Sequence, residues 1–146
     1  MKIDKIMAEI RTMSFYEWRI FMISILLLPV ISLLLRISGY NRTRDLLDHA
    51  RTVKNAQQNS NMEKEKALRI ARMVSIAARY GFYQVNCLGQ SLLTWWLLTH
   101  HGIDAEIRFG VKTQEAPGSL AHAWVEYQGV NLCVSPPSVN YAVMNH

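Results

Sequence analysis

Two residues of this chain have the types and the placement that thiol chemistry requires. Cys87 follows the polar loop 81–86 and opens an apolar, helix-forming stretch, and His122 lies 35 residues further on, in a segment that alternates like a strand. A helix N-terminus carries free N–H groups and a positive dipole end, which stabilise a thiolate and can hold an oxyanion. A histidine within hydrogen-bond reach then serves as the base. Spacing alone leaves two interpretations open: a catalytic pair, or a buried cysteine and an ordinary core histidine.

The residues after Gly81 predict one helix followed by an antiparallel sheet. The dipeptide Gln128-Gly129 is typical of a tight hairpin turn, and Pro136-Pro137 would end the strand that follows it. The expected elements are a helix over 88–98 that closes at Gly102, and strands over 105–111, 120–127 and 130–134. This order is that of an α+β domain.

The first eighty residues predict helices. Residues 1–19 have the spacing of an amphipathic helix, and Ser14 with Glu17 forms a capping box for a helix that enters at Trp18. Ile20 to Leu35 is a run of 16 mostly apolar residues, which Pro29 would kink or end. This run is shorter than the roughly 20 residues of a membrane span, so we favour a buried helix over a docking surface, a membrane-surface element or a span.

Further elements are expected between this apolar run and Gly81. Gly39 and Asn41 signal a stop, and Gly81 ends the last helix before the catalytic segment. The expected elements are a short helix over 42–53, a linker over 54–62 and a helix over 63–80.

Five sequence blocks around Cys87 and His122 resemble a specific family. They are Asn86–Leu92, Trp95–Leu98, Gly102–Ala105, Ile107–Val111 and Ala121–Glu126. In order and spacing they resemble the transglutaminase-like cysteine peptidase of lasso-peptide biosynthesis, the B-type leader peptidase in its stand-alone form without a leader-binding domain. The resemblance is dense over 87–129 and looser over the N-terminal half. It implies a papain/transglutaminase-like core over 61–146 and a helical N-terminal extension over 1–60.

The resemblance also implies an activity and a set of roles. A cysteine endopeptidase would remove the leader from a ribosomally made precursor, and a separate ATP-dependent lasso cyclase would then close the macrolactam. Cys87 would attack the scissile carbonyl, and His122 would move the proton. The backbone N–H of Cys87 would hold the oxyanion, with Gln84 or Asn86 as a side-chain donor. No cofactor is implied.

The third catalytic residue departs from the family pattern. Val134 stands where the family has an acid, about twelve positions after the histidine. A two-residue hairpin would pair Tyr127 with Val130 and, counting along the strands, His122 with Ser135. Ser135 is therefore the best candidate to orient the imidazole, and Glu126 on the same face is the second. A neutral partner stabilises an imidazolium less well, so slow turnover or an acid from elsewhere is expected. A catalytically impaired docking subunit is the alternative function.

Other residues have structural or peripheral interpretations. Trp124 shares the face of His122, and Trp95 stands beside Trp96, so both are candidates to wall the substrate cleft. Asp104 is expected at the surface, and Cys133, in mid-strand, is expected to pack. His100-His101 closes a helix and lacks the second ligand pair of a metal site.

Length, charge and cysteine content restrict the expected partners and cellular location of the protein. A length of 146 residues is that of one domain and leaves no room for leader recognition, so we expect a separate leader-binding protein to capture the precursor peptide. Residues 1–80 hold 14 Lys and Arg against 7 Asp and Glu, but without a nucleic-acid motif. Two cysteines and no evident secretory signal favour the cytoplasm. Membrane association is not favoured, and a membrane-associated acyltransferase is the weakest hypothesis.

Overall fold

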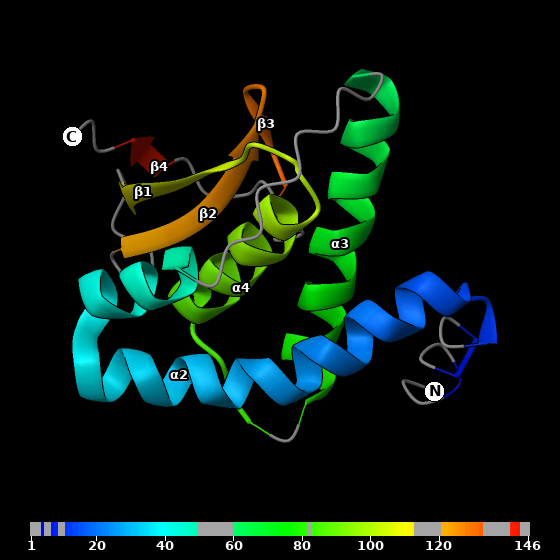
Figure 1. Cartoon of the computed structure of the whole chain (residues 1–146), viewed down its shortest axis with the longest axis horizontal. Coiled ribbons are helices and arrows are strands. Elements are labelled where there is room, and N and C mark those ends of the chain that lie inside the picture. Colours follow the sequence, from blue (N-terminus) through cyan, green and yellow to red (C-terminus); the bar gives the residue numbers. More distant parts are fainter. Residues whose placement is uncertain are drawn as a thin grey trace.

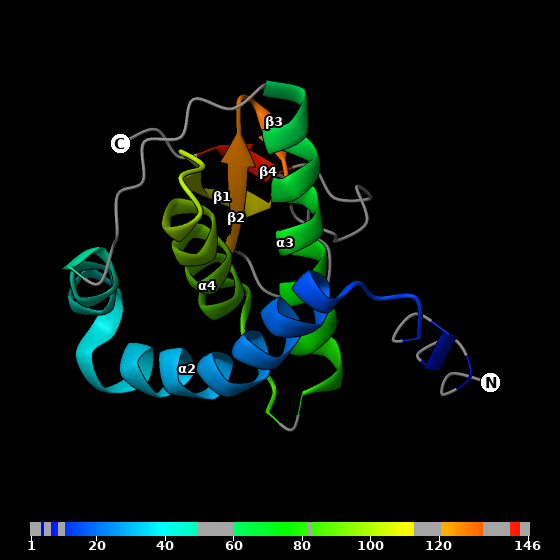
Figure 2. The ribbon, with the colours of Figure 1, turned by 45° about the vertical axis from the view of Figure 1, so that its right-hand side comes forward.

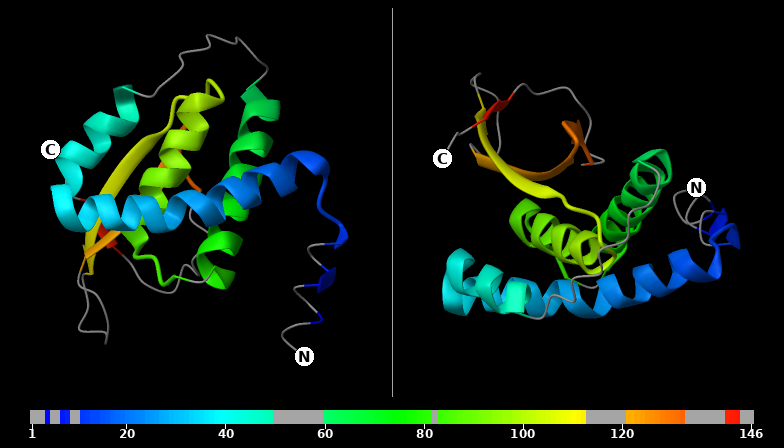
Figure 3. Two further views of the ribbon diagram at one scale, coloured as in Figure 1. Left: turned by 60° about the horizontal axis from the view of Figure 1, so that its bottom comes forward. Right: turned by 45° about the horizontal axis from the view of Figure 1, so that its top comes forward.

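The computed structural model describes residues 4, 7–8, 11–49, 60–81, 83–112, 121–132 and 141–143. Within these ranges the helices are α2 (Phe15–His49), α3 (Ser60–Tyr80) and α4 (Cys87–His100), and the strands are β1 (Glu106–Lys112), β2 (Ala121–Tyr127), β3 (Val130–Asn131) and β4 (Tyr141–Val143). They form three layers, with α2 on the outside, α3 and α4 in the middle, and the sheet beyond them (Figures 1 and 3). The α+β fold class expected from the sequence is confirmed.

Helix α2 begins as its capping box predicts. The N–H of Ser14 donates to Glu17 Oε2 at 2.9 Å, and the N–H of Glu17 donates to Ser14 Oγ at 3.4 Å. The single helix expected over 1–19 is wrong at this point, because Met13 and Ser14 are not helical. The cap therefore separates α2 from the residues before it.

The bend in α2 lies at Gly39 and not at Pro29. The helix continues through Pro29, whose ring is exposed, while neighbouring Leu28 and Ile31 are buried in the core. That packing outweighs the one backbone hydrogen bond that a proline removes. Gly39 has φ 74° and ψ 176°, and the helix changes direction there (Figure 2). The expected stop at Gly39 is thus a sharp bend, after which the helix resumes as far as His49.

Helix α3 begins earlier than expected. It starts at Ser60, so the last three residues of the predicted linker 54–62 are helical, and residues 54–59 lie outside the described ranges. Its buried side includes Ala67, Ile70 and Val74, which are inaccessible to solvent. These residues share one hydrophobic core with α2 and α4. The division of the chain into 1–60 and 61–146 stays a prediction.

The sheet is antiparallel, with the order β3-β2-β1-β4. Gln128 (φ 49°) and Gly129 (φ 74°) form the tight turn between β2 and β3, and positive φ at both positions is the mark of a type I′ hairpin. The expected pairs Tyr127–Val130 and Glu126–Asn131 are confirmed. Strand β3 was expected over 130–134 but is described for two residues, and the expected partner Ser135 lies outside the described ranges. Strand β4, which pairs with β1, was not predicted.

Candidate active site

Cys87 is the first residue of α4, and Asn86 caps this helix. The Asn86 backbone is extended (φ −73°, ψ 164°), and its Oδ1 accepts the N–H of Gly89 at 2.8 Å. Cys87 is a half-buried free thiol. The thiol therefore lies at the positive end of the helix dipole, among the first-turn N–H groups that have no carbonyl partner within the helix.

Gly89 allows the start of α4 to pack closely. A Cβ atom at this position would stand 3.0 Å from Val85 Cγ1, 3.2 Å from Asn86 Oδ1 and 3.4 Å from Ser32 Oγ of α2. The first two distances are tighter than ordinary van der Waals contact, so a larger residue would disturb the cap that places Cys87. No role was predicted for Gly89 from the sequence.

Cys87 and His122 line the same pocket, between α4 and β2. Its volume is about 120 Å³, and its walls come from α3, α4, β2 and the residue after β3. The lining residues are Ala71, Cys87, Gln90, Ser91, Thr94, His122, Ala123, Trp124, Val125 and Leu132. The structure thus brings together the nucleophile and the base that the sequence predicts, although residues 87 and 122 are far apart in the chain. Their catalytic roles stay predictions.

Ser91 forms a hydrogen bond between α4 and β2, the strand that carries His122. Its buried hydroxyl donates to the carbonyl oxygen of Ala123 at 3.0 Å, and Ala123 is the residue after His122. Ser91 lies four positions after Cys87, so both occupy one face of the helix. This residue was missed from the sequence, although a serine at i+4 from the nucleophile in an apolar helix was a usable signal.

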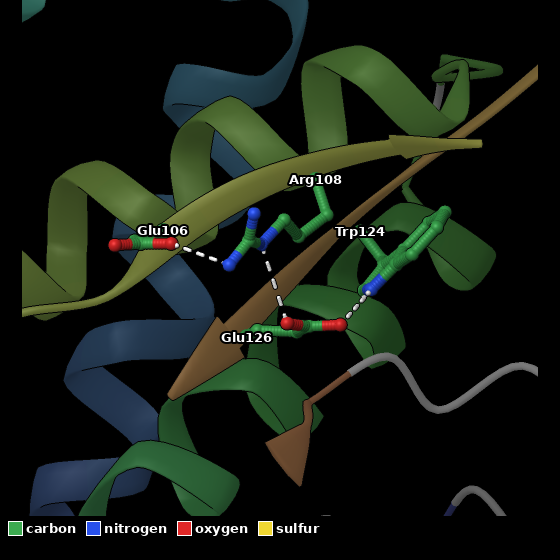
Figure 4. Close-up of polar contacts among 4 residues, drawn as sticks. All are labelled: Glu106, Arg108, Trp124 and Glu126. Atoms are coloured by element: carbon green, nitrogen blue, oxygen red, sulfur yellow. Dashed lines mark hydrogen bonds and ion pairs between the residues drawn. The ribbon is translucent and has the colours of Figure 1, made fainter. Parts of the chain in front are cut away.

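A chain of contacts runs from His122 through Trp124 to β1, and Figure 4 shows its part from Trp124 to Glu106. The Trp124 ring stacks beside the His122 ring, with centroids 6.0 Å apart and an interplanar angle of 21°. Trp124 Nε1–H donates to Glu126 Oε1 at 2.9 Å, and Arg108 Nε forms an ion pair with Glu126 Oε2 at 3.3 Å. Arg108 Nη2 also lies 2.9 Å from Glu106 Oε2. These contacts engage one Glu126 oxygen with Trp124 and the other with Arg108, so they link Glu126 to His122 through the Trp124 ring.

The expected oxyanion donors lie elsewhere. Gln84 and Asn86 line a second hollow, of about 330 Å³, together with Ser32, Arg36 and Tyr40 of α2. Neither lines the pocket of Cys87 as described, and the side-chain oxygen of Asn86 is already engaged as the helix cap. Gln90 lines the pocket beside Cys87 and was not singled out from the sequence.

The two expected cleft tryptophans differ in position. Trp124 lines the pocket, whereas Trp95 is 6% exposed, belongs to the core and has the Arg44 guanidinium 5.6 Å from its ring centroid. The expected cleft contact of Trp95 is therefore corrected to a core contact, because its side of α4 faces α2. Asp104 is exposed, as expected. Ser135, Val134 and Cys133 lie outside the described residues, within which no three potential metal-ligating side chains cluster.

A partly buried hydrogen bond joins β2 to the start of α3. Tyr127, which is 4% exposed, donates its hydroxyl to Glu63 Oε2 at 2.6 Å. This bond to the carboxylate, with burial and the Glu63 charge, raises the pKa of Tyr127 to about 12. The contact connects β2, which carries His122, to α3, which contributes Ala71 to the pocket.

A helix that begins with a cysteine and packs on an antiparallel sheet with a histidine is compatible with the core of transglutaminases and papain-like peptidases. Comparison with family models agrees: the transglutaminase-like superfamily model matches residues 28–145, which include Cys87 and His122, and the chain belongs to this superfamily. The superfamily includes cysteine proteases as well as transglutaminases. Comparisons with curated proteins and with solved structures give no match.

Proposed function

We propose that this chain is a cysteine endopeptidase that removes the leader from a lasso-peptide precursor. The observation that carries the proposal is the pocket shared by Cys87, at the start of α4, and His122, on β2. Membership of the transglutaminase-like superfamily supports thiol chemistry at this site. The sequence blocks from Asn86 to Glu126 support the narrower assignment to leader removal.

In the proposed reaction the Cys87 sulfur attacks the scissile carbonyl carbon, and His122 takes the thiol proton. The backbone N–H of Cys87 donates to the oxyanion that forms. As the C–N bond breaks, His122 gives its proton to the leaving nitrogen, which becomes the α-amine of the core peptide. Water then attacks the thioester with His122 as base, releasing the leader with a free carboxylate and restoring the thiol.

The contacts of His122 supply part of the support that an acid would give. With Val134 at the expected acid position, the stacked Trp124 limits the orientation of the imidazole, and Glu126 and Arg108 hold the indole in place. A stacked indole orients the ring but neutralises less of the imidazolium charge than a carboxylate would.

The proposal includes three partners and a location. The precursor peptide is the substrate, a separate leader-binding protein presents it, and an ATP-dependent cyclase uses the released amine. All of them would meet this chain in the cytoplasm.

The test is cleavage of the precursor by this chain with the leader-binding protein, followed by mass spectrometry. We expect two products, the leader and the core peptide, from cleavage of a single peptide bond. Cys87→Ala should give no products. Cys133→Ala is the matched control and should retain cleavage. Undiminished cleavage by Cys87→Ala would overturn the proposal and favour the docking-subunit alternative.

A further inference from the structure

One side of α2 is apolar and faces solvent. We define the outer face of α2 by the seven large apolar residues before Gly39 that have exposed fractions of 41–79%: Phe15, Trp18, Met22, Leu26, Val30, Leu33 and Ile37. Their spacing of three or four residues places them on one stripe of the helix. The opposite stripe, with Ile20, Leu28 and Ile31, is buried in the core. The buried helix expected over 20–35 is therefore buried on one side.

The outer face is large for an exposed apolar surface. From Phe15 to Ile37 it extends about 33 Å along the helix, at 1.5 Å per residue. With a helix width of about 10 Å, its area is on the order of 300 Å², a size at which exposed apolar patches on monomers are often functional. Helix α2 forms the outermost layer of the molecule (Figure 3).

The charge along α2 is cationic. Between Glu17 and Asp45 the helix carries four arginines and no acidic residue. Two of these, Arg19 and Arg36, are exposed near the ends of the outer face. Apolar side chains that include tryptophan and phenylalanine, with arginines near them, are the pattern of helices that lie in the interface of an anionic membrane.

We propose that the outer face of α2 binds the surface of a membrane that contains anionic lipids, with the helix axis parallel to the bilayer. The apolar side chains would enter the acyl boundary, and Arg19 and Arg36 would contact the headgroup phosphates. The outer face is long enough to lie along this boundary, and it has no acidic residue to repel the lipids.

A membrane span agrees less well with the packing. Helix α2 has the length and hydropathy of a span, and only 28% of its most apolar stretch is buried. Its packing, however, argues against a span. Crossing the bilayer would remove Ile20, Leu28 and Ile31 from the core that they share with α3 and α4. Binding parallel to the surface uses the outer face and leaves this core intact.

A second copy of the chain is a poorer occupant than lipid. A helix face of this size buries well under the roughly 800 Å² per partner that a stable interface needs. Two copies would also bring the arginines together, with no acidic residue on the face to pair with them. The catalytic pocket stays open in the membrane-bound orientation, because its described lining comes from α3, α4, β2 and Leu132 and none of it from α2.

The test is flotation of the whole chain with two kinds of vesicle. One contains phosphatidylcholine and phosphatidylglycerol at a ratio of 3:1, and the other contains phosphatidylcholine alone. We expect at least about tenfold stronger binding to the anionic vesicles, since each cationic residue near such a surface contributes. In Arg19→Gln/Arg36→Gln, binding to the anionic vesicles should fall to the level of binding to phosphatidylcholine alone. Lys64→Gln/Arg69→Gln, at exposed α3 positions, should keep the difference between the two vesicles.

Apolar variants test the same face. Leu26→Ser/Leu33→Ser should weaken binding to both vesicles by at least about tenfold, because two side chains would no longer enter the bilayer. The matched control, Met62→Ser/Leu68→Ser, removes two exposed apolar side chains of α3 and should bind like the wild type. Circular dichroism checks that each variant is folded.

Three results would overturn the proposal: a wild-type chain that stays in solution with anionic vesicles, a Leu26/Leu33 variant that binds as tightly as the wild type, or a wild-type dimer that the same variant converts to a monomer. The last result would assign the face to a second copy. None of these readouts depends on peptide cleavage.

Discussion

Replacing Tyr127 by phenylalanine tests the partly buried hydrogen bond between the end of β2 and the start of α3. The pKa of Tyr127 is raised from 10 in a free phenol to about 12. Because the bond is only partly buried, solvent screening reduces the free energy that this pKa shift represents to on the order of 1–2 kcal/mol, near the lower end for a hydrogen bond to a charged acceptor. Because the folded-state pKa is the higher one, this contribution is complete below pH 10 and is lost as the pH rises from about 10 to 12.

The assay is urea unfolding of both proteins at pH 9 and pH 11. At pH 9 the variant should be less stable than the wild type by about 1–2 kcal/mol. At pH 11 this difference in the free energy of unfolding should shrink to about half, since pH 11 lies midway between the unfolded and folded pKa values of Tyr127. Tyr80→Phe, at an exposed tyrosine, controls for general alkaline effects. A difference that stays constant between the two pH values would refute the argument.

Three further substitutions test the local structure of the site. Gly39→Ala should lower the free energy of unfolding by about 1–3 kcal/mol, because φ and ψ at this position lie in a region that favours glycine. No atom lies within 4 Å of the added Cβ, so the cost would come from backbone strain alone. An unchanged midpoint of thermal unfolding would contradict this. Asn86→Ala should lower the free energy of unfolding by about 1 kcal/mol because it removes the side-chain cap of α4, while Asn86→Asp should retain most of that stability. Equal losses in both variants would show that the cap does not stabilise the helix. Trp124→Phe keeps the ring but loses the hydrogen bond to Glu126, so kcat for precursor cleavage should fall about tenfold with KM within about twofold; a change confined to KM would indicate substrate contact instead.

The hairpin and helix α4 were predictable because their signals are local. The turn Gln128-Gly129 sets the register of the two strands beside it, and alternation along β2 assigns the face shared by His122, Trp124 and Glu126. The start of α4 was predictable from the polar loop 81–86 followed by an apolar run. Neither prediction needed knowledge of distant contacts.

Other features depend on packing, and local patterns did not predict them. Helix α2 continues through Pro29 because its neighbours are held in the core. Strand β4 has three residues, and it forms by pairing with β1, about thirty positions earlier in the chain. The apolar run of α2 is hydrophobic on all sides, so its pattern cannot show that one side faces solvent. The cleft role expected of Trp95 failed for a related reason, since two adjacent tryptophans on a helix give no sign of which layer each one meets.

A double-mutant comparison of Cys87 and His122 tests the central claim most directly. The rates of precursor cleavage by Cys87→Ala, His122→Ala and the double variant are measured with the same leader-binding protein. If the two residues act as one unit, each single variant should lose at least about a thousandfold, and the double variant should lose no more than the worse single one. Losses that multiply, or a single variant that keeps most of its activity, would contradict the account.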